Sequence, residues 1–157
     1  MSEIIIRKAS IKDFQFLVEL DDLLIQSQKS FSWFYDLKRD YLTQVKKFIK
    51  NCLKSKKFVL IVAQDGTKII GYGLLEIKGA NPITKWGKEA VLFDIVVKKE
   101  YQNKGIGSKI FDAIEGIVKN QKIKLLKLDV LFGNDNAKEF YKSKNMESFK
   151  EVMIKKL

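Results

Sequence analysis

The feature that most constrains the fold is a hairpin pattern in the middle of the chain. Residues 58–63 read Phe-Val-Leu-Ile-Val-Ala, and residues 69–77 form a second run of apolar and β-branched residues. The dipeptide Asp65-Gly66 lies between the two runs and is a strong signal for a tight turn. Because so short a turn joins antiparallel strands, the centre of the fold is predicted to be an antiparallel sheet.

The other segments supply further strands and cover that sheet with helices. Ser10 followed by Asp13 resembles a capping box and predicts a helix start. The order predicted from apolar spacing is strand 4–6, helices over 10–25 and 41–53, the hairpin, strand Ala90–Val97, a helix from Ile106, strand Lys124–Leu131, helix Asn134–Lys144 and a closing strand Phe149–Ile154. The strand-helix-strand order near the end requires a right-handed crossover between parallel neighbours. We therefore expect a single α+β (mixed α/β) domain over residues 1–157, with a mixed, mostly antiparallel sheet of about six or seven strands and helices on both faces.

Composition excludes several kinds of chemistry. The chain has 157 residues, no histidine and one cysteine, Cys52. A His-based triad is excluded, and a zinc site made from one Cys and carboxylates would be unusual, so we expect no metal. No basic leader precedes a long apolar stretch, and no apolar run approaches the ~20 residues of a membrane helix. The expectation is a cytoplasmic protein that does not bind membranes.

The net charge of +11 favours anionic partners. These include a phosphate-rich cofactor, nucleic acid or an acidic protein, and a lysine-rich solvated surface explains the charge equally well. Nucleic acid or the ribosome is the less favoured partner, because the sequence holds no recognised nucleic-acid motif.

A glycine-containing loop is predicted to bind phosphate. Gln102-Asn103-Lys104-Gly105-Ile106-Gly107 lies between a strand and an amphipathic helix. The first turn of a helix has unpaired N–H groups and a partial positive charge, and glycines let an oxyanion approach them. The loop is not a P-loop, which needs Gly-Lys-Ser/Thr. It is not a dinucleotide fingerprint either, because the third glycine position holds Ile110.

Two segments together resemble the GNAT superfamily of N-acetyltransferases. Residues 95–108 resemble its acyl-CoA segment, a strand ending in valine and a short loop before Arg/Gln-x-x-Gly-x-Gly/Ala. Residues 134–146 resemble the family pattern Asn-x-x-Ala-x-x-Phe/Leu-Tyr, although Asn145-Met146 replaces the usual Gly-Phe. The order of elements agrees with the family over essentially the whole chain. The resemblance implies a GNAT-like fold and an acetyl-CoA-dependent N-acetyltransferase that acts by direct transfer. The alternatives are a non-catalytic acyl-CoA-binding regulator and a basic nucleic-acid- or ribosome-binding module.

The resemblance also implies roles for individual residues. Tyr141 would protonate the departing thiolate of coenzyme A, with a packed core aromatic as the alternative. Asn134 would bind the pantetheine region, and an N-cap for the short helix is an equally good interpretation. The residues expected to bind the cofactor are Ile95, Val96, Val97, Gln102, Asn103, Lys104, Gly105, Ile106, Gly107, Ser108, Asn134, Ala137 and Tyr141.

The general base is less certain, because three carboxylates compete for it. Strand alternation puts Glu89, Val91, Phe93, Ile95 and Val97 on one face. Phe93 stands where diamine-type members of the family carry Glu. Its neighbour Asp94 should point to the opposite face unless a β-bulge intervenes. Glu76 on the preceding strand is a further candidate, and each of Asp94, Glu76 and Glu89 could instead be a solvated strand-end carboxylate.

The acceptor amine is not readable from the sequence. A small amine or polyamine, an amino acid, or a protein amine would be recognised by residues 26–41 and the loop 79–88. Trp33, Phe34, Tyr35 and Trp86 could line an acceptor pocket, cover the core or form a homodimer interface.

Overall fold

The computed structural model describes residues 3–157 and contains one sheet of five strands in the order β1-β2-β3-β4-β5. The neighbouring pairs are antiparallel except β4 and β5, which are parallel. The hairpin prediction is confirmed, because β2 and β3 pair around Asp65 and Lys68. The strands are β1 (Ile4–Lys8), β2 (Phe58–Asp65), β3 (Lys68–Lys78), β4 (Glu89–Val97) and β5 (Leu125–Leu128).

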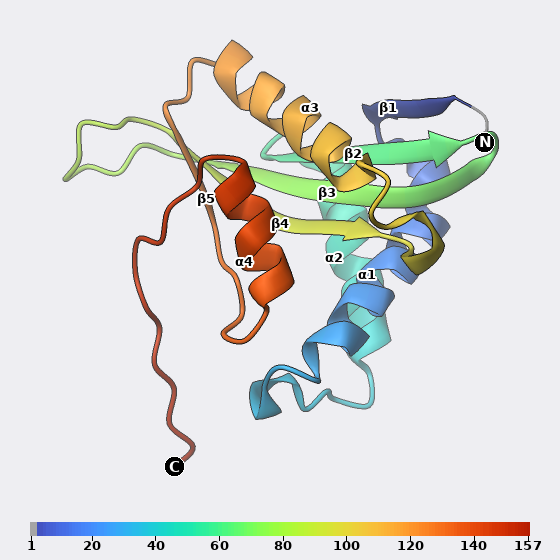
Figure 1. Cartoon of the computed structure of the whole chain (residues 1–157), viewed down its shortest axis with the longest axis horizontal. Helices are drawn as coiled ribbons and strands as arrows, with labels where there is room; N and C mark the ends of the chain where they lie inside the picture. Colours follow the sequence, from blue (N-terminus) through green and yellow to red (C-terminus); the bar gives the residue numbers. More distant parts are fainter. Residues whose placement is uncertain (1–2) are drawn as a thin grey trace.

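Helices cover both faces of this sheet, as predicted (Figure 1). One apolar core lies between the sheet and α1 and α2, with Leu17, Ile49 and Leu74 at its centre. The second core lies between the opposite face and α3, and α4 packs against it through Phe140 and Tyr141. The helices are α1 (Phe14–Gln28), α2 (Tyr41–Lys54), α3 (Ile106–Asn120) and α4 (Asp135–Ser143), with single 3₁₀ turns at Ile11–Asp13, Trp33–Tyr35 and Lys99–Tyr101.

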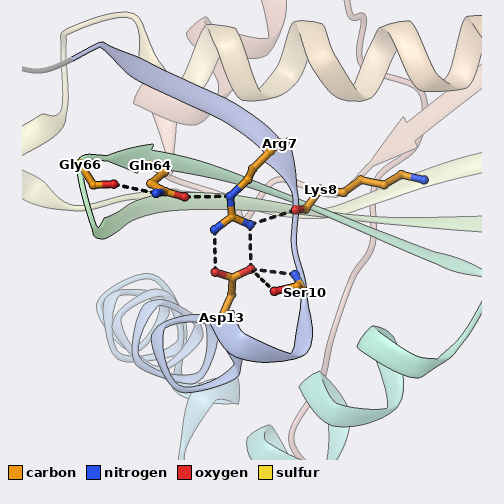
Figure 2. Close-up of polar contacts among 6 residues, drawn as sticks. All are labelled: Arg7, Lys8, Ser10, Asp13, Gln64 and Gly66. Atoms are coloured by element: carbon orange, nitrogen blue, oxygen red, sulfur yellow. Dashed lines mark hydrogen bonds and ion pairs between the residues drawn. The ribbon is translucent and has the colours of Figure 1, made fainter.

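Hydrogen bonds and an ion pair connect the residues before α1 to the edge strand β1 and to β2 (Figure 2). The Arg7 guanidinium on β1 donates two hydrogen bonds of 2.8 Å to the Asp13 carboxylate. A third, from Nε, reaches Gln64 on β2 at 2.8 Å. Asp13 also accepts from the backbone N–H of Ser10 at 2.7 Å, so the predicted pairing of Ser10 with Asp13 is present. This bidentate ion pair fixes where the chain leaves the sheet and enters α1.

A β-bulge in β4 changes the predicted facing of its side chains. Leu75 pairs with Leu92 and Leu74 pairs with Asp94, so Phe93 is the extra residue. Phe93 contacts Phe48 and Phe58 on the α1–α2 side. The prediction that residues 89–97 keep one alternation is therefore wrong. Ile95 and Val97 pack on the α3 side, and Asp94 lies on the same side of the sheet as Phe93.

The two glycines of β3 explain how α3 lies so close to the sheet. A Cβ on Gly73 would come within 2.6 Å of Ile114 and 2.7 Å of Ile110, both on α3. A side chain at this position would push α3 outwards, and the loop before α3 would move with it. Gly73 therefore contributes to the position of the predicted phosphate loop.

The predicted closing strand Phe149–Ile154 does not form. Residues 146–157 have no regular structure, and Phe149 and Met153 are exposed. No strand of the described sheet pairs with this segment, and its faces mix charged and apolar residues, so neither face fixes a register. β5 is also shorter than predicted and ends at Leu128. The sheet therefore has one strand fewer than the lower of the two numbers expected.

Within residues 3–157, no helix combines the length and apolar character needed to cross a membrane. The buried thiol of Cys52 packs in the α1–α2 core.

Candidate active site

The parallel strands β4 and β5 are paired at the start of β4 and separate after Leu92. The candidate site lies at this separation. Their pairing covers only Glu89–Leu92 and Leu125–Leu128. β4 continues to Val97 and stays paired with β3 alone. The loop after β4 leads to α3, and α4 follows β5, so both segments that resemble GNAT proteins lie at this separation (Figure 1).

The loop before α3 has the backbone of an anion site. Asn103 and Gly105 have φ values of 58° and 75°, in the left-handed region. Gly105 is the N-cap of α3, and no side chain from residues 3–157 caps the helix there. A Cβ on Gly105 would meet nothing within 4 Å, so the space in front of the first turn is open. The unpaired N–H groups and the helix dipole favour an anion at this point.

The polar side chains of the loop point back to the protein. The Gln102 side chain donates to the carbonyl oxygen of Val97 at 2.9 Å. The Lys104 ammonium donates to the carbonyl of Glu100 at 2.9 Å and lies 5.5 Å from the centre of the Tyr101 ring. Both contacts stabilise the loop. Val97 is one of the residues expected to bind the cofactor, and its carbonyl oxygen is the acceptor of the Gln102 hydrogen bond.

Helix α4 brings Asn134 and Tyr141 to the same end of the sheet. The Asn134 side chain accepts from the Ala137 N–H at 3.2 Å, which makes it the N-cap of α4. Gly107 on α3 faces α4, and its Cβ would lie 3.8 Å from the Phe140 ring. Asn145, in place of the usual glycine, has φ 61°, a conformation that Asn tolerates.

Tyr141 is held by aromatic rings and remains protonated at neutral pH. Its ring centroid lies 5.1 Å from that of Phe140 and 6.2 Å from that of Phe111. Burial, and secondly the negative charge of Asp94, raise the pKa of Tyr141 to about 12. The charge of Asp94 thus reaches Tyr141, although the two residues come from β4 and α4.

An acidic cluster of two buried residues and one partly buried residue lies on the α1–α2 side of β4. The hydroxyl of Tyr72, which is fully buried, donates a hydrogen bond to Asp21 of α1. Burial, and secondly the charge of Asp21, raise the pKa of Asp94 to about 7, while Tyr72 opposes the rise. Burial likewise raises the pKa of Asp21. A phenol has one proton, so Tyr72 can donate to only one carboxylate at a time. We call Asp21, Tyr72 and Asp94 the acidic cluster.

The acidic cluster borders a cavity of about 290 Å³ between α1, α2 and β4. Its residues are Asp21, Leu24, Ile25, Gln28, Gln44, Val45, Phe48 and Asp94. None of the lining residues is basic. No ion pair within residues 3–157 uses Asp21 or Asp94.

The other two candidate bases have different surroundings. Glu89 forms an ion pair of 2.8 Å with Lys127 on β5. Glu76 lies 3.7 Å from the Lys78 ammonium. Neither lines the cavity.

Sequence reasoning missed Asp21 and Tyr72. A signal was available for Asp21, because it interrupts the apolar spacing of Leu17 and Leu24 on the buried stripe of α1. Tyr72 carried none, because an aromatic residue between two strand glycines is usually a packing residue. The exposed Trp33, Phe34 and Trp86 do not cover the core. Tyr35 is partly buried, and burial followed by the charges of Asp94 and Asp129 raises its pKa.

The sequence profile of the acetyltransferase (GNAT) family matches residues 20–145. The chain therefore belongs to the acetyltransferase (GNAT) family.

Individual relatives agree with that assignment. The chain is 33% identical over 88 residues to thialysine N-ε-acetyltransferase from Bos taurus, covering 55% of this chain and 49% of the relative. It thus spans about half the length of the curated relatives it matches. A crystal structure of a tetramutant protein from Bacillus halodurans has a TM-score of 0.80 at 25% identity, over 98% of this chain and 99% of that one. An aminoglycoside N-acetyltransferase in complex with CoA has a TM-score of 0.80 at 13% identity, over 100% and 96%. At that identity it shows the shared fold alone.

Proposed function

We propose that this chain is an N-acetyltransferase that moves an acetyl group from acetyl-CoA to a primary amine, by direct attack in a ternary complex. One acyl-CoA N-acyltransferase domain over residues 1–157 would carry the reaction. The observation that supports it most is the juxtaposition, at the open end of β4, of an uncapped helix N-terminus with Asp94 and Tyr141. The N-terminus of α3 would bind phosphate, and Asp94 and Tyr141 would accept and donate the protons that move during aminolysis.

The loop fits coenzyme A on its own geometry. The N–H groups of residues 103–108 are the proposed donors to the pyrophosphate, and the open space at Gly105 admits the oxyanion. The free side of β4 from Ile95 to Val97 is the proposed contact of the pantetheine arm, with Ala137 and Asn134 beside it. Among residues 3–157, no group of three potential ligands gathers as a metal site.

The chemistry needs one proton acceptor and one proton donor. The amine nitrogen forms a bond to the thioester carbonyl carbon, the carbon–sulfur bond breaks, and coenzyme A leaves. An alkylamine with a pKa near ~10 is mostly protonated at neutral pH, so a base must take a proton. We assign that role to Asp94, because its pKa of about 7 is matched to neutral pH. Glu89 is the weaker candidate, since Lys127 already neutralises it.

Tyr141 is the proposed proton donor to the thiolate, and Asp94 is coupled to it. With a pKa of about 12, Tyr141 keeps its proton but gives it up reluctantly to a thiolate whose conjugate acid has a pKa near ~8.5. The charge of Asp94 is one cause of that high pKa. When Asp94 takes the amine proton this charge disappears, so accepting the first proton makes the second easier to donate.

The test of cofactor use compares two glycines with the same backbone. Gly105 and Gly87 have φ of 75° and 76°, and both have open space at the Cβ position. Gly105→Val and Gly87→Val therefore introduce the same local strain, but only the first blocks the phosphate loop. We expect acetyl-CoA to raise the Tm of the wild type and of Gly87→Val, and to bind Gly105→Val at least tenfold more weakly. Equal affinity of two folded variants, or no binding to the wild type, would refute the proposal. Thiol release from acetyl-CoA over a panel of amines then measures transfer itself.

A further inference from the structure

We propose that the cavity between α1, α2 and β4 is the acceptor site, and that it takes an unbranched alkylammonium group, with the acidic cluster as its counter-charge. This rests on the proposed function, and it specifies the class of amine. The relatives named above act on two different classes of amine: thialysine, and aminoglycosides.

The charges at this site argue for a cation that the chain does not supply. The chain as a whole is basic, with a net charge of +11. Yet Asp21 raises the pKa of Asp94, and the charge of Asp94 in turn raises the pKa values of Tyr35, Cys52, Tyr72 and Tyr141, none of which carries a positive charge. The buried carboxylate of Asp21 and the partly buried carboxylate of Asp94 repel one another without a cation, and a bound ammonium ion would remove that cost.

The walls specify what carries the ammonium group. The apolar part of the cavity lining consists of Leu24 and Ile25 from α1 and Val45 and Phe48 from α2. Besides the two carboxylates, the polar side chains of the lining are the amides of Gln28 and Gln44, and the Gln44 side-chain N–H already donates to Asp40 at 2.8 Å. A polyhydroxylated ring would leave hydroxyls unpaired against these apolar side chains, whereas methylenes would pack on them. The volume of about 290 Å³ lies at the lower end of small-molecule sites, which favours a slim chain.

The position of Asp94 connects this cavity to the site of transfer. Asp94 follows the last pair between β4 and β5, at the bulge that brings its side chain to the α1–α2 side. It also acts on the pKa of Tyr141 at α4. An ammonium group bound at Asp94 therefore lies next to the separation of the strands, where the thioester is proposed to arrive.

Asp21 is assigned as a positioning residue within this site. Asp21 is 5% exposed and accepts the hydrogen bond from Tyr72. Asp21 and Asp94 both line the cavity. The charge of Asp21 strengthens the attraction for a cation, and its hold on Tyr72 leaves the Asp94 carboxylate free to meet the ligand.

The test measures binding of amines without turnover. Ethylammonium, butylammonium, butan-1-ol and glucosammonium are titrated into the protein at pH 8 and followed by NMR, and the glucosammonium affinity is referred to its protonated fraction, because the amine of glucosamine is largely neutral at that pH. We expect butylammonium to bind at least tenfold more tightly than butanol and than glucosammonium. From ethylammonium to butylammonium, each added methylene group should increase the affinity roughly fourfold. Butanol or glucosammonium binding as tightly as butylammonium would overturn the proposal.

Variants locate the site. Asp94→Asn should weaken butylammonium binding about tenfold or more, and Tyr72→Phe should change it less. Glu115→Gln removes the same charge from an exposed pair with Lys119 on α3 and should change nothing. Unchanged butylammonium binding by a folded Asp94→Asn variant overturns the assignment of the cavity. If butylammonium binds as expected but no amine releases thiol from acetyl-CoA, the cavity assignment stands and the proposed transferase activity fails.

Discussion

Two aspartates, Asp13 before α1 and Asp94 on β4, show how the same side chain acquires different properties. Asp13 is held by the forked guanidinium of Arg7, and this hydrogen bonding lowers the pKa of Asp13 to about 2 (Figure 2). Asp94 has no basic partner in residues 3–157, and burial raises its pKa to about 7. Asp13 is fully occupied by the fold, whereas Asp94 has capacity left for a ligand. A partly buried carboxylate that has no cationic partner in residues 3–157 is a candidate for binding a cation from outside.

The largest expected effect is the loss of transferase activity when Asp94 is replaced. Asp94→Asn removes the proposed base and should lower kcat/KM for an alkylamine by about 10²–10⁴. Because the base must be deprotonated, wild-type kcat/KM should rise with pH through about 7. That limb should be absent in Asp94→Asn. Steady-state kinetics from pH 5.5 to 9 check both. A larger loss in Glu89→Gln or Glu76→Gln than in Asp94→Asn would transfer the role to that residue.

Tyr141 tests whether the acidic cluster reaches the leaving group. Tyr141→Phe keeps the ring contacts with Phe111 and Phe140 and deletes the hydroxyl. We expect kcat to fall by about 10²-fold or more, with little change in acetyl-CoA affinity. Single-turnover kinetics and calorimetry provide the two measurements. Full turnover with rate-limiting chemistry would make Tyr141 a packing residue, and only Tyr141→Ala would then be harmful, through instability.

Asp13 should matter for stability and not for binding. Asp13→Asn removes both guanidinium hydrogen bonds and leaves Arg7 without its anion, so unfolding free energy should fall by about 2–3 kcal/mol. Denaturant unfolding at pH 7 measures this. Asp112→Asn, which breaks an exposed pair with Lys144, is the control and should stay within about 0.5 kcal/mol. A loss no larger than in the control would show that the network in Figure 2 is not a structural anchor.

The smallest effect is an opposite pH dependence of stability. The pKa of Asp13 is lower in the folded state, so its contribution is present above about pH 4 and is lost as pH falls towards 2. The pKa of Asp94 is higher in the folded state, so its contribution is present below about pH 4 and is lost as pH rises through 7. Asp94→Asn should therefore equal the wild type near pH 4 and exceed it at pH 8 by about 1–2 kcal/mol. A variant less stable than the wild type at pH 8 would contradict the raised pKa.

Much of the fold was readable from local signals. The Asp65-Gly66 turn, the capping pair Ser10 and Asp13, and the apolar stripe of α3 each depend on residues close in sequence. The same holds for the loop Gln102–Gly107, whose conformation follows from two residues that tolerate positive φ. The closing strand Phe149–Ile154 was predicted wrongly, because a strand forms only if a neighbour pairs with it.

The sequence by itself determined the family, the order of elements up to residue 144 and the place of the loop Gln102–Gly107 before α3, because helix starts, turns and motifs depend on neighbouring residues. Only the tertiary structure decided which carboxylates meet. One extra residue at Phe93 turns Asp94 to the α1–α2 side, where Asp21 arrives from α1 and Tyr72 from β3. Their raised pKa values arise from burial and mutual proximity, which exist only once residues 51 positions apart along the chain are packed together.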